Sequence, residues 1–372
     1  MGFRPIPVDG LIRRRVSRVA AMSIMPESVR FLIPPRFRPV LRRIALAALA
    51  RTPTISHRDR IIGLDYAPAI DPTARLTILD ADKAPSSRIE LGRDVFLGRQ
   101  VELTAARGGS IRIDDDTSIQ DASIVFGNIR IGAHCLFGKY CFIASSGHSF
   151  RTWPEWLIRD QDRLTLSQLP SPAESEKSLV RIEDDCWIAQ SVVISPGIYI
   201  GRGAVIGANA VVTSDVGPYE IHGGTPNRKL GARLAFQPPR AIEAGDDAAI
   251  PYFYRGFRLG QPALRRSRAL GIVEARSQAC IVLASAPGAK LSLSGLCHDA
   301  GGCTIQLRIG GTDAGTHRIA AGAFAIEAVV PASNVASAVP GPLAQATYIE
   351  LEVVGAAAPN YGIGSAKLTG GA

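Results

Sequence analysis

The segment ASSGHSF, residues 144–150, places two serines and a histidine within four positions. A histidine ionises near neutral pH, so its imidazole can take a proton from a weakly acidic hydroxyl and act as a general base. A serine nucleophile at Ser145 or Ser146 is the alternative, but no G-x-S-x-G elbow surrounds either residue. We therefore assign the acid–base chemistry to His148 and regard the serines as structural, with a serine–histidine pair as the minor alternative.

Metal chemistry finds less support in the sequence. Cys297 and Cys303 flank His298 in LCHDAGGC, but this cluster lacks the spacing of a zinc site. Six cysteines in 372 residues also do not make a disulfide framework. We expect neither a bound metal nor disulfides.

The sequence around His148 repeats with a period of six residues, which fits neither a helix nor a surface strand. Aliphatic or aromatic residues mark the period in three blocks: Leu91, Leu97 and Leu103; Ile113, Ile119, Val125, Ile131, Phe137 and Ile143; Ile182, Ile188, Ile194, Ile200, Ile206 and Val212. A hexapeptide period predicts a parallel β-helix, in which three hexads close one triangular coil. Fifteen hexads would give about five coils around a continuous aliphatic core.

Each position of the hexad has its own expected role. The marker residue points inward, and the residue four positions later is small or β-branched and fits a corner, as at Cys135, Cys141 and Ala204. Glycine often follows the marker directly, as in Phe137-Gly138, and we expect it to relieve the backbone of the turn.

Two interruptions break the repeat, a short one at 104–112 and a long one at 147–180. Long insertions in repeat folds project from one face and often carry function. This one begins at His148 and contains Trp153 and Trp156, and either Asp160 or Asp162 could orient the histidine.

The net charge of +9 is concentrated at the N-terminus. Residues 1–60 contain thirteen arginines and three acids, so the remainder is close to neutral and nucleic acid is not an expected partner. Two amphipathic stretches there are expected to cap the first coil or to bind the anionic inner face of a membrane, and the two roles are compatible. Without an apolar run long enough to span a bilayer, or a signal peptide, we expect a cytoplasmic protein.

Four segments follow from these patterns, and the chain is expected to be mainly β. They are a basic helical segment (1–64), a β-helix (65–235), a polar linker (236–251) and an accessory domain (252–372). The last contains short β-rich runs separated by turn residues, which predicts a β-sandwich.

The tail of the repeat, with DDCWIAQSVVISPG, IGANAVVTSDV and GGTPNRK after ASSGHSF, resembles the hexapeptide-repeat acyltransferases. It is most similar to galactoside, maltose and streptogramin acetyltransferases and to bacterial polysaccharide O-acetyltransferases. The resemblance implies a left-handed β-helix and a homotrimer with active sites in clefts between subunits. It also implies acetyl-coenzyme A as donor and a saccharide hydroxyl as acceptor, which His148 deprotonates as the general base. The reaction would belong to the biosynthesis of a surface polysaccharide or glycolipid.

The resemblance also implies roles for individual residues. Trp187-Ile188-Ala189-Gln190 stands where the family has Trp-Ile-Gly-Ser, so Trp187 and Ala189 would contact the donor and the Gln190 backbone N–H would bind the oxyanion. Further positions that match donor contacts are Ala208, Thr213 and Arg228, and the candidates for the donor's phosphates are Arg228, Lys229 and Arg233. Trp153 and Trp156 could stack on the sugar.

Two other functions compete with acyl transfer. The chain could be a non-catalytic trimeric scaffold in which the β-sandwich binds sugar. It could also be a metal enzyme like the γ-class carbonic anhydrases, which needs three converging histidines, whereas only His134 and His148 fall within the repeats. The sequence names neither the acceptor nor the length of the acyl chain.

Overall fold

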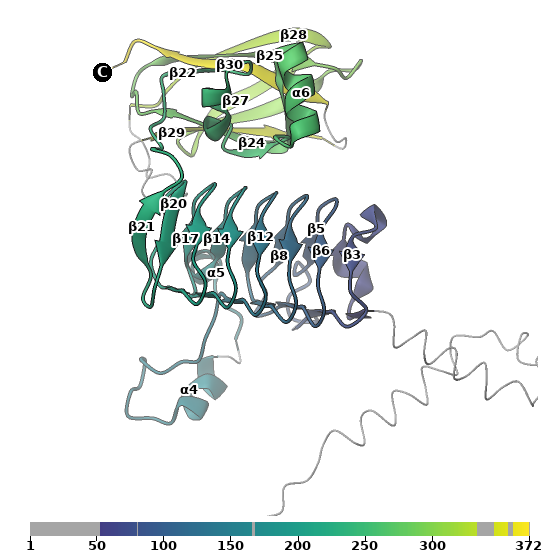
Figure 1. Ribbon diagram of the computed structural model, residues 1–372, viewed down its shortest axis with the longest axis vertical. Helices are drawn as coiled ribbons and strands as arrows, with labels where there is room; N and C mark the ends of the chain where they lie inside the picture. Colours follow the sequence, from purple (N-terminus) through teal and green to yellow (C-terminus); the bar gives the residue numbers. More distant parts are fainter. Residues whose placement is uncertain (1–52, 80, 166–167, 333–345, 356–359, 372) are drawn as a thin grey trace, which may run out of the picture.

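A computed structural model describes residues 53–79, 81–165, 168–332, 346–355 and 360–371. It consists of a parallel β-helix with a C-terminal antiparallel β domain beside it (Figure 1). The capping and membrane roles predicted for the basic N-terminus fall mainly on residues 1–52, outside the described ranges, and stay predictions. In the described part of the chain, no helix is long and apolar enough to cross a membrane.

Three parallel sheets form the faces of the β-helix, which we name A, B and C. Face A contains β1 (Thr54–Ile55), β4 (Arg75–Ile78), β7 (Glu102–Ala105), β10 (Ile124–Phe126), β13 (Phe142–Ala144), β16 (Val193–Ile194) and β19 (Val211–Val212). Face B contains β2 (Ile61–Ile62), β5 (Ile89–Leu91), β8 (Ile111–Ile113), β11 (Ile129–Ile131), β14 (Val180–Ile182) and β17 (Tyr199–Ile200). Face C contains β3 (Ala69–Ile70), β6 (Phe96–Leu97), β9 (Ser118–Ile119), β12 (Leu136–Phe137), β15 (Trp187–Ile188), β18 (Val205–Ile206), β20 (Glu220–Gly223) and the antiparallel β21 (Arg228–Ala232).

The predicted hexad positions are confirmed by the core. Marker residues such as Leu97, Ile143 and Ile200 are no more than 1% exposed, and the small residues four positions later are buried at the corners. Successive coils align in register, so Leu76, Leu103, Val125, Ile143, Ile194 and Val212 form one inward ladder. Such a ladder removes apolar surface from water in every coil, at about 25 cal/mol per Å².

The β-helix is longer than predicted. It begins at Thr54 rather than at residue 65, and face A has seven strands rather than the five that the hexads suggested. The 3-10 turns at Arg58–Arg60 and Leu64–Tyr66 lie between the first strands and disturb the period of six. The first coils are therefore present in the fold but hidden in the sequence.

The glycine after the marker has a different purpose from the one expected. Left-handed backbone occurs two positions further on, as at His134 and Tyr140, whereas Gly138 is absent from the left-handed region. A Cβ on Gly138 would lie 2.6 Å from the backbone nitrogen of Gln190 in the next coil. This glycine is needed because two coils approach closely, not because the turn itself is strained.

The long insertion leaves the β-helix after β13 and returns at β14. It contains α4 (Ile158–Thr165) and α5 (Pro172–Ser178). Ser171 and Glu174 form a capping box with Pro172 at the start of α5, a signal that the sequence already carries. The part with α4 projects away from the C-terminal domain (Figure 1).

The C-terminal domain is antiparallel, as predicted, with one strand shared between two layers. Its elements are β22 (Ala241–Glu243), η4 (Asp247–Tyr252), β23 (Arg255–Phe257), α6 (Gln261–Leu270), β24 (Val273–Ala284), β25 (Lys290–Cys297), β26 (Cys303–Ile309), β27 (Thr312–Ile319), β28 (Gly322–Val329), β29 (Ala346–Val353) and β30 (Tyr361–Thr369). The long β24 pairs with β29 at one end and with β30 at the other. Because β22 pairs with β30, the domain begins at about residue 241, and most of the predicted linker belongs to it.

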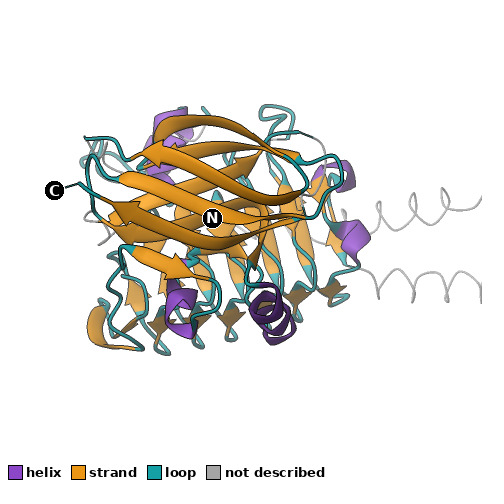
Figure 2. Cartoon of the chain, turned by 90° about the horizontal axis from the view of Figure 1, so that it is seen from above, coloured by secondary structure: helices purple, strands orange, loops and turns teal. Residues whose placement is uncertain are grey.

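The C-terminal domain lies over the coils of the β-helix (Figure 2) and contacts them at the corner between faces B and C. At this seam the hydroxyl oxygens of Tyr199 and Tyr254 are 2.6 Å apart, and the Gly256 N–H donates to the Asp184 carboxylate at 3.2 Å. Glu183, only 1% exposed, accepts from Arg255 at 3.0 Å. Burial raises the pKa of the Glu183 carboxyl, and Arg255 opposes that shift.

We expect Arg255→Ala to destabilise the protein by about 3 kcal/mol, because it leaves the Glu183 carboxylate buried without its cation. The measurement is the free energy of unfolding by urea, followed by tryptophan fluorescence. Arg99→Ala is the matched control, since Arg99 pairs with Asp121 at an exposed site, where water and salt screen the pair and its contribution to stability should be small. Equal losses of unfolding free energy in the two variants would refute a large contribution of the Glu183–Arg255 pair to stability.

Candidate active site

Each corner of the β-helix carries a different structure. The insertion with His148 leaves the corner between faces A and B, after Ala144 at the end of β13. The C-terminal domain occupies the corner between faces B and C. The third corner, between faces C and A, is built from short turns that include Gly138, Gln190 and Asn209.

His148 is held by a carboxylate of α4. Its Nδ1 lies 2.5 Å from Oδ2 of Asp162, whose Oδ1 accepts from the backbone N–H of Ser149 at 2.8 Å. These bonds, first that of Ser149 and then that of His148, hold the pKa of the Asp162 carboxyl below its usual value. Because a carboxylate accepts at Nδ1, the neutral imidazole presents Nε2 as its basic nitrogen.

The structure distinguishes between the two acids that were candidate partners of the histidine. Asp160 pairs with Arg163 one helical turn away at 3.0 Å and does not contact the histidine, whereas Asp162 does. The His148 side chain remains 76% exposed, so its imidazole is open to a reacting group. This arrangement suits a general base that is oriented by an acid.

Ser145 is structural, as predicted. It is 4% exposed, and its Oγ accepts from the backbone N–H of Asn128 at 2.7 Å. A Cβ on Gly127 in the preceding coil would lie 2.2 Å from this hydroxyl oxygen. Ser145 therefore joins two coils and is not placed as a nucleophile.

A hollow of about 580 Å³ lies at the base of the insertion, beside Gly147 and Ser149, the residues on either side of His148. Hydroxyl-bearing side chains from both ends of the insertion line it: Ser145, Ser146, Ser149, Thr152, Thr165, Ser175 and Ser178. Its size and its hydrogen-bonding groups fit a small polar ligand.

The two tryptophans of the insertion stack on each other, with ring centroids 5.1 Å apart and planes 19° apart. Gln161 of α4 fixes the loop between them, since it accepts from the Trp153 N–H and donates to the Trp156 carbonyl. One face of each ring is thus used within the chain. Trp156 is 45% exposed, so its outer face is available for a sugar.

The residues predicted to bind the donor gather elsewhere, around face C and its corner with face A. Trp187 points outward from β15 and is 54% exposed. The carbonyl of Gln190 accepts from Asn209, next to Ala208, and no acceptor for the Gln190 N–H is found in the described part of the chain. A free N–H at this corner can stabilise an oxyanion.

The remaining residues predicted to contact the donor differ in exposure and in whether they already bind another residue of the chain. Arg228 is exposed at the start of β21 and has no ion pair among the described residues, whereas Lys229 binds Glu220 at 2.6 Å. Thr213 is exposed at the end of β19, and its N–H donates to Asn227. Arg233, another basic residue of this region, turns to the opposite corner and binds Asp185.

Within one chain, His148 and Gln190 do not come together. Gln190 precedes β16 at one edge of face A, and His148 follows β13 at the other edge. The full width of the face separates the candidate base from the candidate oxyanion donor. A site that uses both residues requires a second copy of the chain.

Exposed apolar side chains gather on faces C and A and at the corner between them. Leu136 and Trp187 are neighbours in register on face C, 56% and 54% exposed. Tyr140 at the corner and Phe142 on face A are 58% and 44% exposed. Apolar side chains gathered in this way are typical of a protein interface.

The two repeat histidines that a zinc enzyme would share lie apart. His134 is at the corner between faces B and C, where its Nδ1 lies 2.8 Å from Asp116, and His148 belongs to the insertion. Across the described ranges, no group of three His, Cys, Asp or Glu side chains could hold a metal ion.

Comparison with known proteins places the repeat. The family model for the bacterial transferase hexapeptide (six repeats) matches residues 180–214. The chain is 32% identical over 110 residues to a chloramphenicol acetyltransferase of Klebsiella aerogenes, covering 28% of this chain and 51% of that protein. It is 31% identical over 169 residues to the probable acetyltransferase Rv3034c of Mycobacterium tuberculosis, covering 44% and 51%.

A third relative is the putative lipopolysaccharide biosynthesis O-acetyl transferase WbbJ of Escherichia coli (strain K12). It is 27% identical over 143 residues, covering 37% of this chain and 68% of that protein. The chain spans about half the length of the first two relatives. Residues 180–214 thus carry the hexapeptide repeat of bacterial transferases, and the chain resembles the hexapeptide-repeat acyltransferases, as predicted.

Proposed function

We propose that this protein transfers an acetyl group from acetyl-coenzyme A to a hydroxyl of a saccharide. The observation that carries the proposal is the His148–Asp162 pair, which holds an exposed imidazole at the mouth of the insertion. The relatives named acetyltransferases support the reaction, and the putative O-acetyl transferase among them supports a hydroxyl acceptor.

In the proposed mechanism, Nε2 of His148 removes the proton of the acceptor hydroxyl as its oxygen attacks the thioester carbon. Asp162 stabilises the imidazolium that forms, since its carboxylate already accepts from Nδ1. The tetrahedral intermediate places negative charge on the former carbonyl oxygen, to which the Gln190 N–H donates. Its collapse breaks the carbon–sulfur bond, and the proton on His148 passes to the leaving thiolate.

We further propose that the active site forms between copies of the chain, most simply in a homotrimer. The apolar surface of Leu136, Tyr140, Phe142 and Trp187 would be covered by the neighbouring copy. The neighbour's insertion would then bring its His148 to the corner that carries Gln190. The acceptor would lie in the hollow beside that histidine, with Trp156 available to stack on it.

Acetyl transfer can be assayed directly. Purified protein is incubated with acetyl-coenzyme A and neutral oligosaccharides, the free thiol is measured, and the modified sugar is identified by mass spectrometry. A mass increase of one acetyl group, removed by mild base as expected for an ester, supports O-acetylation. With amino sugars as a second set of probes, an increase that resists mild base would indicate an N-acyltransferase, and thiol release that leaves every sugar unmodified would refute transfer.

We expect Arg228→Ala to weaken the binding of coenzyme A by about tenfold at low ionic strength, because an Arg–phosphate contact is a charge-assisted hydrogen bond. The loss should shrink as salt screens the charges. Lys229→Ala is the matched control, and we expect a smaller loss because Lys229 already binds Glu220. Calorimetry would contradict the assignment if the two losses were equal.

A further inference from the structure

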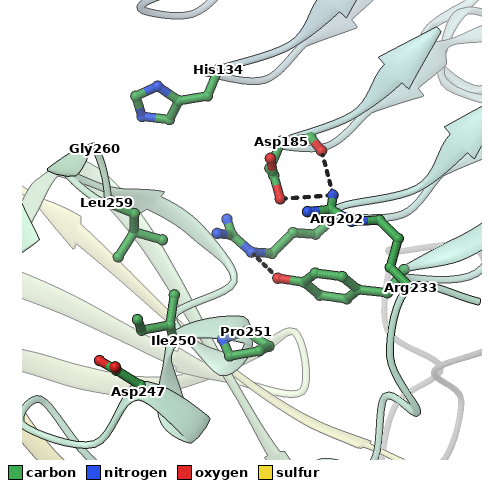
Figure 3. A pocket seen from close by; sticks show the side chains of 10 residues that line it. His134, Asp185, Arg202, Arg233, Asp247, Ile250, Pro251, Leu259 and Gly260 are labelled. Carbon is green, nitrogen blue, oxygen red and sulfur yellow. Dashed lines mark hydrogen bonds and ion pairs between the residues drawn. The ribbon is translucent and has the colours of Figure 1, made fainter.

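A pocket of about 480 Å³ lies between the two domains and is not used by the proposed reaction (Figure 3). The β-helix contributes His134, Asp185, Arg202, Tyr219 and Arg233, and the C-terminal domain contributes Asp247, Ile250, Pro251, Leu259 and Gly260. It is placed at the corner between faces B and C, whereas the predicted donor contacts surround the corner between faces C and A. The pocket is therefore a separate candidate site.

The walls of this pocket are fixed by the seam between the domains. The Arg202 backbone N–H donates to the Tyr254 hydroxyl at 3.2 Å, and its Nη1 donates to the Tyr254 carbonyl at 3.0 Å. The ring of Tyr219 stacks on Phe236, whose centroid is 5.8 Å away. Binding sites for small molecules are usually preformed in this way, often at domain boundaries.

Arg202 supplies a donor that the protein leaves unused. The residue is 4% exposed, and its Nε donates to the Tyr219 hydroxyl at 3.1 Å. Within the described ranges, its Nη2 has no acceptor, and Figure 3 shows the end of the guanidinium directed into the pocket. A guanidinium held this rigidly is ready to donate to an oxygen of a ligand.

His134 supplies a matching acceptor. Its Nδ1 lies 2.8 Å from Asp116, while its buried Nε2 has no hydrogen-bond partner. If Nδ1 carries the proton for the Asp116 carboxylate, Nε2 has a free lone pair. A buried nitrogen without a partner is costly, and because this one has almost no accessible surface, the imidazole must turn toward the pocket before a ligand hydroxyl can satisfy it.

The charges of the pocket are balanced, which argues against an anionic ligand. Arg233 binds Asp185 at 3.0 Å, and Arg202 lies 3.7 Å from Asp184 behind the wall. His134 faces Asp116, and Asp247 adds a further carboxylate to the lining. No surplus of positive charge is left to hold a phosphate or a carboxylate.

The opposite wall is apolar, formed by Ile250, Pro251 and Leu259. One apolar wall facing donors and acceptors matches a sugar ring, which has a C–H face and a rim of hydroxyls. We propose that this pocket binds one neutral saccharide unit, with hydroxyls bonded to Arg202 and His134 and the ring against Leu259. The site would hold a carbohydrate chain at a distance from the reacting unit, and the binding does not depend on acyl transfer.

The test is saturation-transfer NMR on the full-length protein with five probes: D-glucose, D-galactose, D-mannose, L-rhamnose and N-acetyl-D-glucosamine. We expect at least one probe to bind with a millimolar Kd that changes less than about twofold between low and high salt, since no net charge is engaged. Leu259→Trp, which fills the pocket, should weaken this binding by more than about tenfold. Because the proposed acceptor hollow can bind the same sugars, Leu259→Trp is measured in a Trp156→Ala background, where the remaining signal should come from the pocket.

His134→Asn is the second variant, in case Leu259→Trp does not fold. Asparagine tolerates the left-handed backbone of this position but cannot reach as far as Nε2, so we expect a loss of about fivefold, the worth of one hydrogen bond. The proposal is overturned if none of the five sugars binds, or if binding survives both variants. Loss of binding in Trp156→Ala alone would assign the sugar to the acceptor hollow instead.

Discussion

Replacing His148 with alanine is expected to lower kcat for acetyl transfer by about 10²- to 10⁴-fold, the usual contribution of a general base. The side chain is 76% exposed and contributes nothing to the aliphatic core, so folding and the Kd for coenzyme A should be unchanged. Steady-state kinetics with the thiol assay, together with circular dichroism and calorimetry, measure these quantities. A variant that keeps more than about a tenth of the wild-type kcat would contradict the role.

Two further variants make this test specific. His298→Ala removes another exposed histidine, from the C-terminal domain, and should be neutral. Asp162→Asn keeps the shape of the orienting residue but removes its charge, so we expect a loss in kcat that is smaller than that of His148→Ala, with KM unchanged. The pH profile of Asp162→Asn should also shift, which a merely structural role would not produce.

Gly138→Ala should lower kcat by about 10²-fold, because the new Cβ would lie 2.6 Å from the backbone nitrogen of Gln190 and displace the proposed oxyanion donor. Gly98→Ala is the matched control, since its Cβ would lie 2.8 Å from the backbone nitrogen of Asp121 at the same corner, two coils before Gln190. Both variants carry the strain, but only Gly138→Ala disturbs Gln190. Equal activities of the two variants would remove Gln190 from the mechanism.

Gly138→Ala, combined with His148→Ala, also tests whether the site is shared between copies. Chains with His148→Ala and chains with Gly138→Ala are unfolded together, mixed in equal amounts and refolded. If one copy supplies the base and the next supplies the N–H, random assembly restores about a quarter of wild-type activity, because each site pairs two intact residues with that probability. If both residues served the same site from one chain, the mixture would stay inactive.

The core of the β-helix could be predicted from the sequence because each hexad repeats one local rule. A residue such as Ile188 faces the same environment in every coil, so its type reports its burial. The first coils escaped prediction where short helical turns near Arg58 and Leu64 disturb the period. The start of the C-terminal domain was misplaced because the strand at Ala241 pairs with a strand more than a hundred residues away.

The candidate site, too, could be predicted from the sequence only in part. Its residue types and the insertion were visible in the sequence, but the choice of Asp162 over Asp160 required α4, which turns one carboxylate toward His148 and the other toward Arg163. The seam partners Glu183 and Arg255 lie 72 positions apart and follow no period. Contacts of this kind depend on how two domains meet, which no local pattern encodes.

The insertion, the C-terminal domain and the turns with Gln190 each occupy a different corner of the β-helix, and this arrangement affects how the protein can change over time. The aliphatic core separates the three corners, so substitutions at the insertion, at the seam and at the Gln190 corner should have additive effects on stability. A new loop at one corner would then leave the other two intact. The triangular cross-section thereby lets the insertion and the accessory domain change independently of each other, whereas the insertion of one copy and the Gln190 corner of the next would have to change together in the proposed shared site.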